Sequence, residues 1–450
     1  MVGFALLIIA VIGVFFLRDP ATLLKLAFDR EVLIGLLVVN AALFIFRTVV
    51  VVDAYRVSPG VALSHWKAWL GGLGVGALLL VPHGLFAYYD GVQFDLINTV
   101  FTSPATALPT TTAPPGTSAP PPTTVTDPTD GSPVSSTVAP TTTTTLPPTT
   151  EPPGPWGDIE RLNILLLGSD AGLGRTGVRT DTMILASVDV ANGDLALISV
   201  PRNFARVPLP EEIGIWSCDC FPPILNELYQ YAEARPDSFP GPATPGANAI
   251  KGAISELTGL PVHLYALVAL DGFVDIVDAI GGVTITVTER IYDPDYPKEG
   301  GGTEVVNLQP GVYDFDGHEA LAYARSRHSS DDYSRMSRQR CVIEAVLEQS
   351  DPFSLLRKFP QLAEVIKASV ETDIPLDLMP DLIDLMGLVD TDEAVSLRLV
   401  PPTYVGGYDA DRHHTPDVEL IREHARIVTT LSPAEAMAEL GIDPLADACG

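Results

Sequence analysis

Residues 183–200 read MILASVDVANGDLALISV, and this stretch decides the fold class. It holds two apolar segments, residues 183–190 and 195–200, on either side of Asn192 and Gly193. An Asn-Gly pair between apolar segments is a strong signal for a β-hairpin, because both residues accept a positive φ. The stretch therefore predicts two antiparallel strands joined by a type I′ turn.

The segments around this hairpin alternate between strand and helix patterns. A continuous apolar run at residues 162–167 predicts a buried strand before the hairpin. After the hairpin, strand patterns at 263–269 and 283–288 flank a helical pattern at 271–280. This alternation indicates an α/β layer structure. The other predicted elements are helices at 225–234, 247–257, 316–324 (opened by a capping box of Asp316 and Glu319), 334–349, 353–370, 377–388 and 417–431, and a strand at 396–400.

Three long apolar segments precede this domain, at residues 1–17, 32–52 and 69–89. Each has about the 17 to 25 residues that a helix needs to cross a bilayer, so we expect three transmembrane helices. A cleaved signal peptide is the alternative for the first segment, although that segment lacks a basic leader. With a cytoplasmic N-terminus, three spans place everything after residue 89 on the outer face of the cell membrane.

Residues 102–153 consist mainly of Thr, Pro, Ser and Ala. A segment of this composition cannot bury enough apolar surface to fold, so we expect an extended stalk. The sequence thus predicts an all-α transmembrane region at residues 1–100, a disordered linker at 101–155 and a globular domain at 156–450.

The charge of the chain is strongly negative, with 27 Lys and Arg against 56 Asp and Glu. This excess argues against nucleic acid as a partner. Five arginines nevertheless gather within residues 323–340. A planar guanidinium grips phosphate oxygens with two hydrogen bonds, which favours a bound anion. The alternative is a solvated helix face balanced by its own acids. The arginines are Arg325, Arg327, Arg335, Arg338 and Arg340, and Asp331 and Asp332 lie among them.

Two acids and another arginine are predicted at strand ends. Asp170 follows the first strand, Asp181 precedes the second, and Arg202 follows Pro201 at the end of the third. Two carboxylates on adjacent strands could share a Mg²⁺ ion, which binds few protein oxygens and completes its shell with phosphate and water. The alternative for each Asp is an ordinary turn or cap residue.

At this point the chain resembles the LytR-CpsA-Psr family of cell-wall enzymes, over residues 162–349. The resemblance rests on the order of several motifs: Gly-x-Asp at 168–170, Arg-x-Asp-Thr at 179–182, Ser-Val-Pro-Arg at 199–202, residues 271–283, Arg-x-Arg at 325–327, and Asp-x-x-Arg-x-x-Arg-Gln at 332–339. It implies a membrane-anchored, extracytoplasmic, three-layer α/β/α domain. It also implies a phosphotransferase that moves a glycopolymer from a polyprenyl-pyrophosphate carrier to a peptidoglycan hydroxyl.

The same resemblance implies roles for individual residues. Asp170 and Asp181 would hold Mg²⁺. Arg202, Arg325 and Arg327 would clamp the pyrophosphate, with Arg179, Arg338 and Gln339 in support. Asp332 would orient an arginine or act on the acceptor, and the acceptor proton would pass to Asp170 or Asp332. Candidate walls for the prenyl chain are residues 343–347 and 249–257, with ordinary core as the alternative reading.

Two features depart from the family pattern. Asn203 stands where the family usually has Asp, and three spans are expected where the family more often has one. Two other functions use the same residues. One is a polyprenyl-pyrophosphate pyrophosphatase with water as acceptor, and the other is a non-catalytic, lipid-binding envelope regulator.

The four cysteines are Cys218, Cys220, Cys341 and Cys449. A bridge within Cys218-Asp-Cys220 would be strained, so we expect each of these two to pair with Cys341 or Cys449. A metal site at Cys218 and Cys220 is the alternative. Among the histidines, His328 lies beside the arginines, whereas His263 at the start of a strand is expected to be structural.

Overall fold

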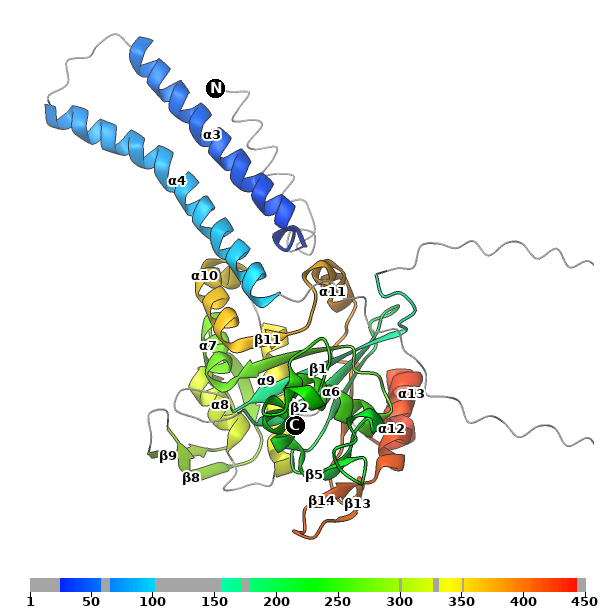
Figure 1. The fold of residues 1–450 in the computed structure, drawn as a ribbon. Coiled ribbons are helices and arrows are strands. Elements are labelled where there is room, and N and C mark those ends of the chain that lie inside the picture. Colours follow the sequence, from blue (N-terminus) through cyan, green and yellow to red (C-terminus); the bar gives the residue numbers. More distant parts are fainter. Residues whose placement is uncertain are drawn as a thin grey trace, which may run out of the picture.

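The computed structural model describes residues 25–57, 65–101, 155–170, 178–298, 302–326, 332–349 and 352–442 (Figure 1). Two long helices, α3 (Arg30–Val57) and α4 (His65–Val100), stand together at one end of the molecule. By length and composition both could cross a membrane. They contain two of the predicted spans. The third predicted span, residues 1–17, and the predicted linker at 102–153 lie outside the described residues.

One mixed sheet of six strands forms the centre of the domain: β1 (Arg161–Ser169), β2 (Thr180–Asp189), β3 (Leu195–Ser199), β6 (Leu264–Ala269), β11 (Val370–Thr372) and β12 (Val395–Arg398). Their order is β11-β6-β1-β2-β3-β12. β2 is antiparallel to both β1 and β3, whereas β6 runs parallel to β1, and β12 runs parallel to β3. The predicted hairpin is therefore the middle of the sheet.

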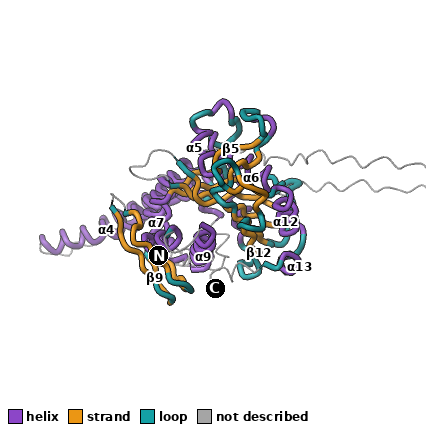
Figure 2. Tube along the Cα trace, turned by 90° about the horizontal axis from the view of Figure 1, so that it is seen from below, coloured by secondary structure: helices purple, strands orange, loops and turns teal. Residues whose placement is uncertain are grey.

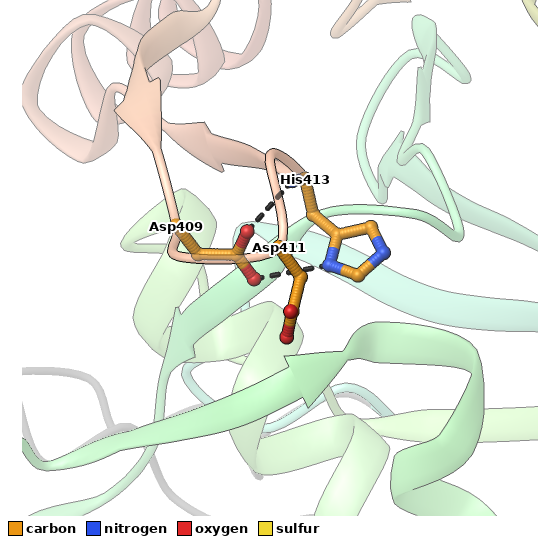
Figure 3. Close-up of side chains that lie close together, drawn as sticks. All are labelled: Asp409, Asp411 and His413. Carbon is orange, nitrogen blue, oxygen red and sulfur yellow. Dashed lines mark hydrogen bonds and ion pairs between the residues drawn. The ribbon is translucent and has the colours of Figure 1, made fainter.

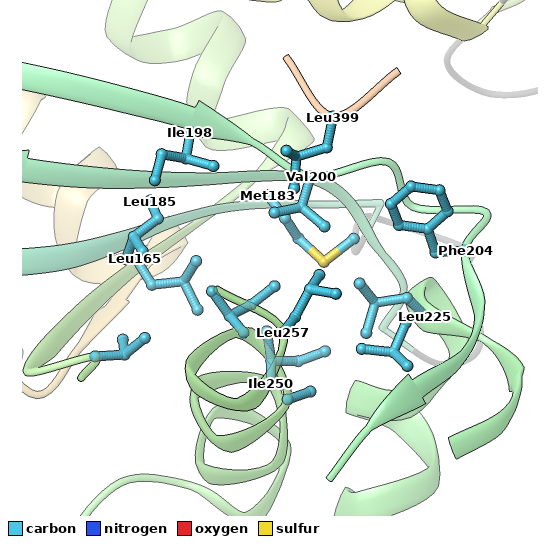
Figure 4. Close-up of a cluster of buried hydrophobic side chains, with 14 of the residues drawn as sticks. Leu165, Met183, Leu185, Ile198, Val200, Phe204, Leu225, Ile250, Leu257 and Leu399 are labelled. Atoms are coloured by element: carbon cyan, nitrogen blue, oxygen red, sulfur yellow. The ribbon is translucent and has the colours of Figure 1, made fainter. Parts of the chain in front are cut away.

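Helices cover both faces of this sheet, which confirms the α/β/α architecture. One face packs against α6 (Pro245–Thr258) and α12 (Val418–Thr430), and Leu165, Leu185, Ile198 and Ile250 meet in that core (Figure 4). The other face packs against α11 (Met379–Met386), and Ile343 of α9 (Asp332–Gln349) joins the same cluster. The side chains of one strand alternate between the two cores, as a strand with both faces buried requires.

A smaller layer beside the sheet supports α9. It consists of α7 (Leu270–Ile280), β7 (Val283–Val287), the hairpin of β8 (Ile291–Pro297) and β9 (Thr303–Leu308), β10 (Gly311–Phe315) and α8 (Gly317–Arg325). Seen from below, α9 lies between this layer and β12 (Figure 2). α8 begins with the predicted capping box, in which the Asp316 side chain accepts from the Glu319 backbone and the Glu319 side chain accepts from the Asp316 backbone.

The C-terminal end of α4 contacts the globular domain. Leu96 and Val100 of α4 pack on Ala363 of α10 (Pro352–Ser369), and Lys367 Nζ lies 2.5 Å from Asp95 Oδ2. α10 leads directly into β11, the edge strand of the sheet. The domain is therefore joined to the two long apolar helices at this edge of the sheet.

Two details of the predicted fold are wrong. The hairpin does not close with a type I′ turn, because only Gly193 has a positive φ there, whereas a type I′ turn needs one at Asn192 as well. Asp189 instead accepts hydrogen bonds from the backbone N–H groups of Ala191 and Asn192.

Cys218 and Cys220 are bonded to each other rather than to distant partners, and Cys341 is also disulfide-bonded. The positive φ of Asp219 lets the chain turn back within this short loop.

Several short elements have no counterpart in the prediction. β4 and β5 form a hairpin beside the sheet, and β13 and β14 form another near the C-terminus. Most of the unpredicted strands have three to five residues, too few positions for a period of two to emerge, whereas β8 has seven residues and β9 has six. The unpredicted elements are β4 (Ala205–Pro208), β5 (Cys220–Ile224), β8, β9, β10, β11, β13 (Val405–Tyr408), β14 (His414–Pro416) and α13 (Pro433–Leu440).

His263 has the structural environment that its position predicted. The ring is buried and its Nδ1 accepts a hydrogen bond from the Asn163 N–H at 3.0 Å. Burial, followed by the charge of Lys251, lowers the pKa of His263 to about 4. The folded protein therefore holds this ring neutral.

We expect acid to destabilise the fold through His263. Between pH 6.5 and 4 the imidazole of His263 binds a proton in the unfolded chain but not in the folded chain. The free energy of unfolding therefore falls as pH falls, by about 3 kcal/mol in total. Urea unfolding of the detergent-solubilised protein at several pH values measures this slope. His263→Gln should flatten it, and an unchanged slope in that variant would contradict the assignment.

Candidate functional site

The antiparallel register brings three residues that are far apart in the sequence to the same end of the strands β1, β2 and β3. β1 and β3 end where β2 begins, because Ser169 pairs with Thr180 and Ser199 pairs with Ile184. Asp170 directly follows β1, Asp181 is the second residue of β2, and Arg202 lies just beyond β3. The three predicted residues thus lie at the same end of the sheet, where Asp181 and Arg202 are in contact and Asp170 is hydrogen-bonded to the backbone of Arg179.

Asp181 and Arg202 form the central contact at these strand ends. Arg202 Nη1 donates to Asp181 Oδ1 at 2.6 Å, and Asn226 Nδ2 donates to the same oxygen at 3.3 Å. Burial alone would raise the pKa of Asp181, but the charge of Arg202, the hydrogen bonds from Arg202 and Asn226, and the charge of Arg335 together lower it. Asp181 is therefore an ionised carboxylate that holds Arg202 in place.

A pocket opens next to this ion pair, between the strand ends and α9. From α9 it is lined by Arg335, Met336 and Gln339, and from β2 and the end of β3 by Asp181, Thr182, Met183, Ile184, Ser199, Val200 and Arg202. Arg335 is buried, and its Nη1 donates to the Asp181 backbone carbonyl at 3.3 Å. Two guanidinium groups and one amide thus face a single small pocket, an arrangement that suits an oxyanion.

Arg335 was not among the predicted site residues, although the arginine segment contains it. Arg335 and Gln339 are four residues apart, so they lie on one face of a helix. That spacing was available in the sequence. Identifying the face that meets the strand ends required the packing of α9.

Arg338 points to a different place from the one predicted. Its Nε donates to the Tyr323 carbonyl at 2.8 Å, and its Nη2 donates to the Ser326 carbonyl. Arg338 is only 8% exposed. These hydrogen bonds tie α9 to the end of α8, while the predicted support of the pyrophosphate clamp by Arg338 stays a prediction.

The remaining predicted residues lie at various distances from the pocket. The backbone N–H of Arg179 donates to Asp170 Oδ1 at 2.8 Å, and the Asp170 N–H donates to the Arg179 carbonyl at 2.9 Å. The Arg179 guanidinium lies 3.7 Å from Glu227 Oε1. Arg325 ends α8 and lies against the Tyr296 hydroxyl, whose pKa is raised by burial and lowered in part by Arg325. Arg327 and the side chain of Asp332 lie outside the described residues.

The carboxylates of Asp170 and Asp181, at these strand ends, fit the chemistry of a Mg²⁺ site. Magnesium takes one or two protein carboxylates and fills its remaining positions with water and phosphate oxygens. Asp170 and Asp181 follow and begin adjacent paired strands, so the sheet itself sets their separation. The role of Asp170 and Asp181 as ligands of this ion stays a prediction from the sequence.

A second group of possible metal ligands lies on the β13–β14 hairpin (Figure 3). Asp409 Oδ1 accepts from the His413 N–H at 2.7 Å, and Asp409 Oδ2 lies 3.0 Å from His413 Nδ1. Asp409 thus closes the hairpin turn, while Asp411 and His413 are exposed. The contacts within this group account for its geometry.

Comparison with known proteins gives the following matches. Residues 142–407 match the model of the LytR_cpsA_psr family. A relative from Oceanobacillus iheyensis, called polyisoprenyl-teichoic acid–peptidoglycan teichoic acid transferase TagU, is 26% identical over 320 residues, which cover 71% of this chain and 80% of the relative. The protein of the same name from Halalkalibacterium halodurans is 29% identical over 222 residues, which cover 49% of this chain and 63% of the relative.

Solved structures of similar proteins were also found. The crystal structure of TagV from B. subtilis matches with a TM-score of 0.43 and 22% identity, over 60% of this chain and 97% of that one. A structure described as TagT bound to LIIa-WTA matches with a TM-score of 0.41 and 20% identity, over 63% of this chain and 92% of that one.

The position of Arg338 generates a stability prediction. Arg338→Lys keeps the charge but loses the fork that reaches two carbonyl groups, so we expect about 1–3 kcal/mol of destabilisation. Hydrogen exchange should also accelerate at residues 323–326. Urea unfolding and exchange mass spectrometry measure both effects, with Arg426→Lys on the exposed face of α12 as the control. Unchanged stability with weakened substrate binding would return Arg338 to the ligand-binding role.

Proposed function

The chain belongs to the LytR_cpsA_psr family, and from that membership we propose that it transfers a glycopolymer from a polyprenyl-pyrophosphate carrier to a peptidoglycan hydroxyl. The observation that carries the proposal is the pocket at the strand ends, where Arg202, Arg335 and Gln339 converge beside Asp181. The two relatives described above are named for this reaction with teichoic acid as the polymer.

The pocket provides what phosphoryl transfer requires. Such reactions need charge neutralised on the non-bridging oxygens and an acceptor held in line, more than covalent help from the protein. Arg202 and Arg335 would bind the diphosphate oxygens. Because Asp181 fixes Arg202 at 2.6 Å before substrate arrives, little reorganisation is needed on binding.

In the proposed reaction, the acceptor oxygen forms a bond to the polymer-proximal phosphorus. The bond from that phosphorus to the bridging oxygen of the diphosphate breaks, and polyprenyl phosphate leaves with the electron pair. The acceptor proton passes to Asp170 or Asp332. Asp181 is a poor proton acceptor, because Arg202, Asn226 and Arg335 lower its pKa. A bound Mg²⁺ would supply further charge neutralisation on the diphosphate.

We also propose that the domain works at the outer face of the cell membrane, as a multi-pass protein. Two apolar helices and the contact of α4 with α10 support a position close to the bilayer. The Cys218–Cys220 disulfide supports an oxidising compartment outside the cytoplasm. In that position the site would meet both a membrane-bound carrier and the cell wall.

We expect the purified full-length protein to join a lipid-pyrophosphate-linked glycopolymer to peptidoglycan. Arg202→Ala should lower the rate by about 100-fold or more, because it removes a preorganised cation and the ion-pair partner of Asp181. Arg426→Ala, an exposed arginine on the far face of the sheet, is the matched control. Product is measured as polymer attached to isolated wall.

The same assay distinguishes the two other functions. Release of phosphate-capped polymer with no wall conjugate would identify a pyrophosphatase. Carrier binding with no turnover, and full complementation of a wall-attachment defect by Asp170→Ala, would identify a non-catalytic regulator.

We expect the transfer to depend on Mg²⁺. Chelation should abolish it and added Mg²⁺ should restore it, while Asp170→Asn should need more Mg²⁺ for half-maximal rate because one carboxylate ligand is lost. The rate measured against Mg²⁺ concentration tests this. Full activity in excess chelator would rule out the metal role of Asp170 and Asp181.

A further inference from the structure

Arg340 is a buried cation that the site described above does not use. It is 3% exposed. Within the described part of the chain, neither its Nε nor its Nη1 has a hydrogen-bond partner. Burying a guanidinium without partners is costly, because the charge loses its water shell and gains nothing in return. A residue in this condition indicates an anion that completes it.

The charged residues around Arg340 do not neutralise its positive charge. After burial itself, the largest influence on the pKa of Arg340 is the positive charge of Arg398, and together they lower that pKa to about 10. Glu344, one turn further along α9, acts in the opposite direction but more weakly. Arg398 is exposed, and its Nη1 donates to Ser337 Oγ at 2.7 Å. Ser337 and Arg340 are three residues apart and share one face of α9.

Two buried hydroxyl groups lie on the strands beneath. Ser396 and Arg398 are two residues apart on β12 and therefore point to the same face of the sheet, and Arg398 pairs with Ser199 of β3. Among the described residues, Ser199 Oγ and Ser396 Oγ are buried without a hydrogen-bond partner. Ser199 also lines the pocket. The polar side chains of Ser199, Ser396 and Arg398 therefore adjoin the pocket on the side of β12.

We propose that Arg340 and Arg398, with Ser199 and Ser396, form a second anion subsite that takes a phosphate-type oxyanion of the glycopolymer. Guanidinium forks bind two oxygens of such a group, and hydroxyls donate to the others. Neutral ligands or water would satisfy the hydroxyls but would leave the two cations unbalanced. The assignment rests on the proposed transferase function.

The direction of the sheet favours the polymer over the lipid carrier as the source of this anion. The membrane helix α4 meets the domain at α10, which leads into the β11 edge. Arg398 lies on β12, the opposite edge, and the pocket lies between them at β2 and β3. A carrier that enters from the membrane side and occupies the pocket would thus send its polymer toward Arg398.

A binding experiment tests the subsite without relying on turnover. Equilibrium dialysis of the full-length protein in detergent against inorganic phosphate at low salt counts bound phosphate. We expect Arg398→Gln and Arg340→Met each to bind one phosphate fewer than the wild type, and Arg426→Gln to match the wild type. Equal phosphate binding by all four proteins would overturn the proposal.

Thermal unfolding separates a ligand-binding role for Arg340 from a structural one. Because neither Nε nor Nη1 of Arg340 has a hydrogen-bond partner in the described chain, Arg340→Met should unfold at the wild-type temperature or higher when phosphate is absent. It should also lose the stabilisation that phosphate gives the wild type. A lower melting temperature without phosphate, together with unchanged stabilisation by phosphate, would mean that Arg340 is structural.

Kinetics then identify the source of the anion. With a carrier bearing a phosphodiester-rich polymer, Arg398→Gln should raise KM by about tenfold, the effect of one lost charge-assisted hydrogen bond, with kcat unchanged. With a carrier bearing a neutral sugar, KM should not change. An equal rise for both donors would assign the subsite to the diphosphate of the carrier and overturn the assignment to the polymer.

The two proposals fail in distinguishable ways. If the wild type transfers no donor, the proposed function is wrong, while the dialysis result still decides whether the anion subsite exists. If the wild type transfers both donors and the variants bind phosphate normally, only the subsite is wrong.

Discussion

The contact between Asp181 and Arg202 is the constraint on which the site depends. Arg202 follows β3 and Asp181 begins β2, so their 2.6 Å hydrogen bond joins the ends of two antiparallel strands. Pro201 interrupts the ladder just before Arg202 and fixes where the arginine emerges. Because the pair is largely buried, its attraction is only weakly screened by salt. The protein thus presents a cation whose position is set by the sheet rather than by the ligand.

Around this pair, α9 places three arginines in the interior, and each is treated differently. Arg338 satisfies two carbonyl groups at the end of α8, and Arg335 reaches the carbonyl of Asp181. Arg340 has neither kind of partner for its Nε and Nη1 within the described chain. A helix with buried charge on several faces is costly to fold. The small layer of β7, β10, α7 and α8 offsets part of that cost by packing Cys341, Val342 and Ala345 of α9 into a core of its own.

Much of this arrangement could be predicted from the sequence, for reasons that differ between elements. The strands β1, β2, β3 and β6 are apolar runs bounded by polar residues, so they and the residues at their ends were predicted together. The site depended on helix phase, which no local pattern reports. Arg335 and Arg338 are equally basic, and only the packing of α9 shows that Arg335 enters the pocket while Arg338 faces α8. The Cys218–Cys220 bond depends on the positive φ of Asp219, which is likewise invisible to composition.

The sheet also connects the helix α4 to the site. α10 carries the contact with α4 and continues into β11, where Glu371 Oε1 accepts hydrogen bonds from Tyr229, Thr244 and Tyr265. These bonds tie the edge strand to α5 (Leu228–Glu233), to the start of α6 and to β6. The Lys367–Asp95 pair contributes little by itself, because the Asp95 side chain is 61% exposed. Leu96 and Val100 pack on Ala363 beside this pair, and Lys25 forms a second ion pair with Asp384 of α11. The contact with α4 therefore acts on an edge strand that is itself hydrogen-bonded to three neighbouring elements.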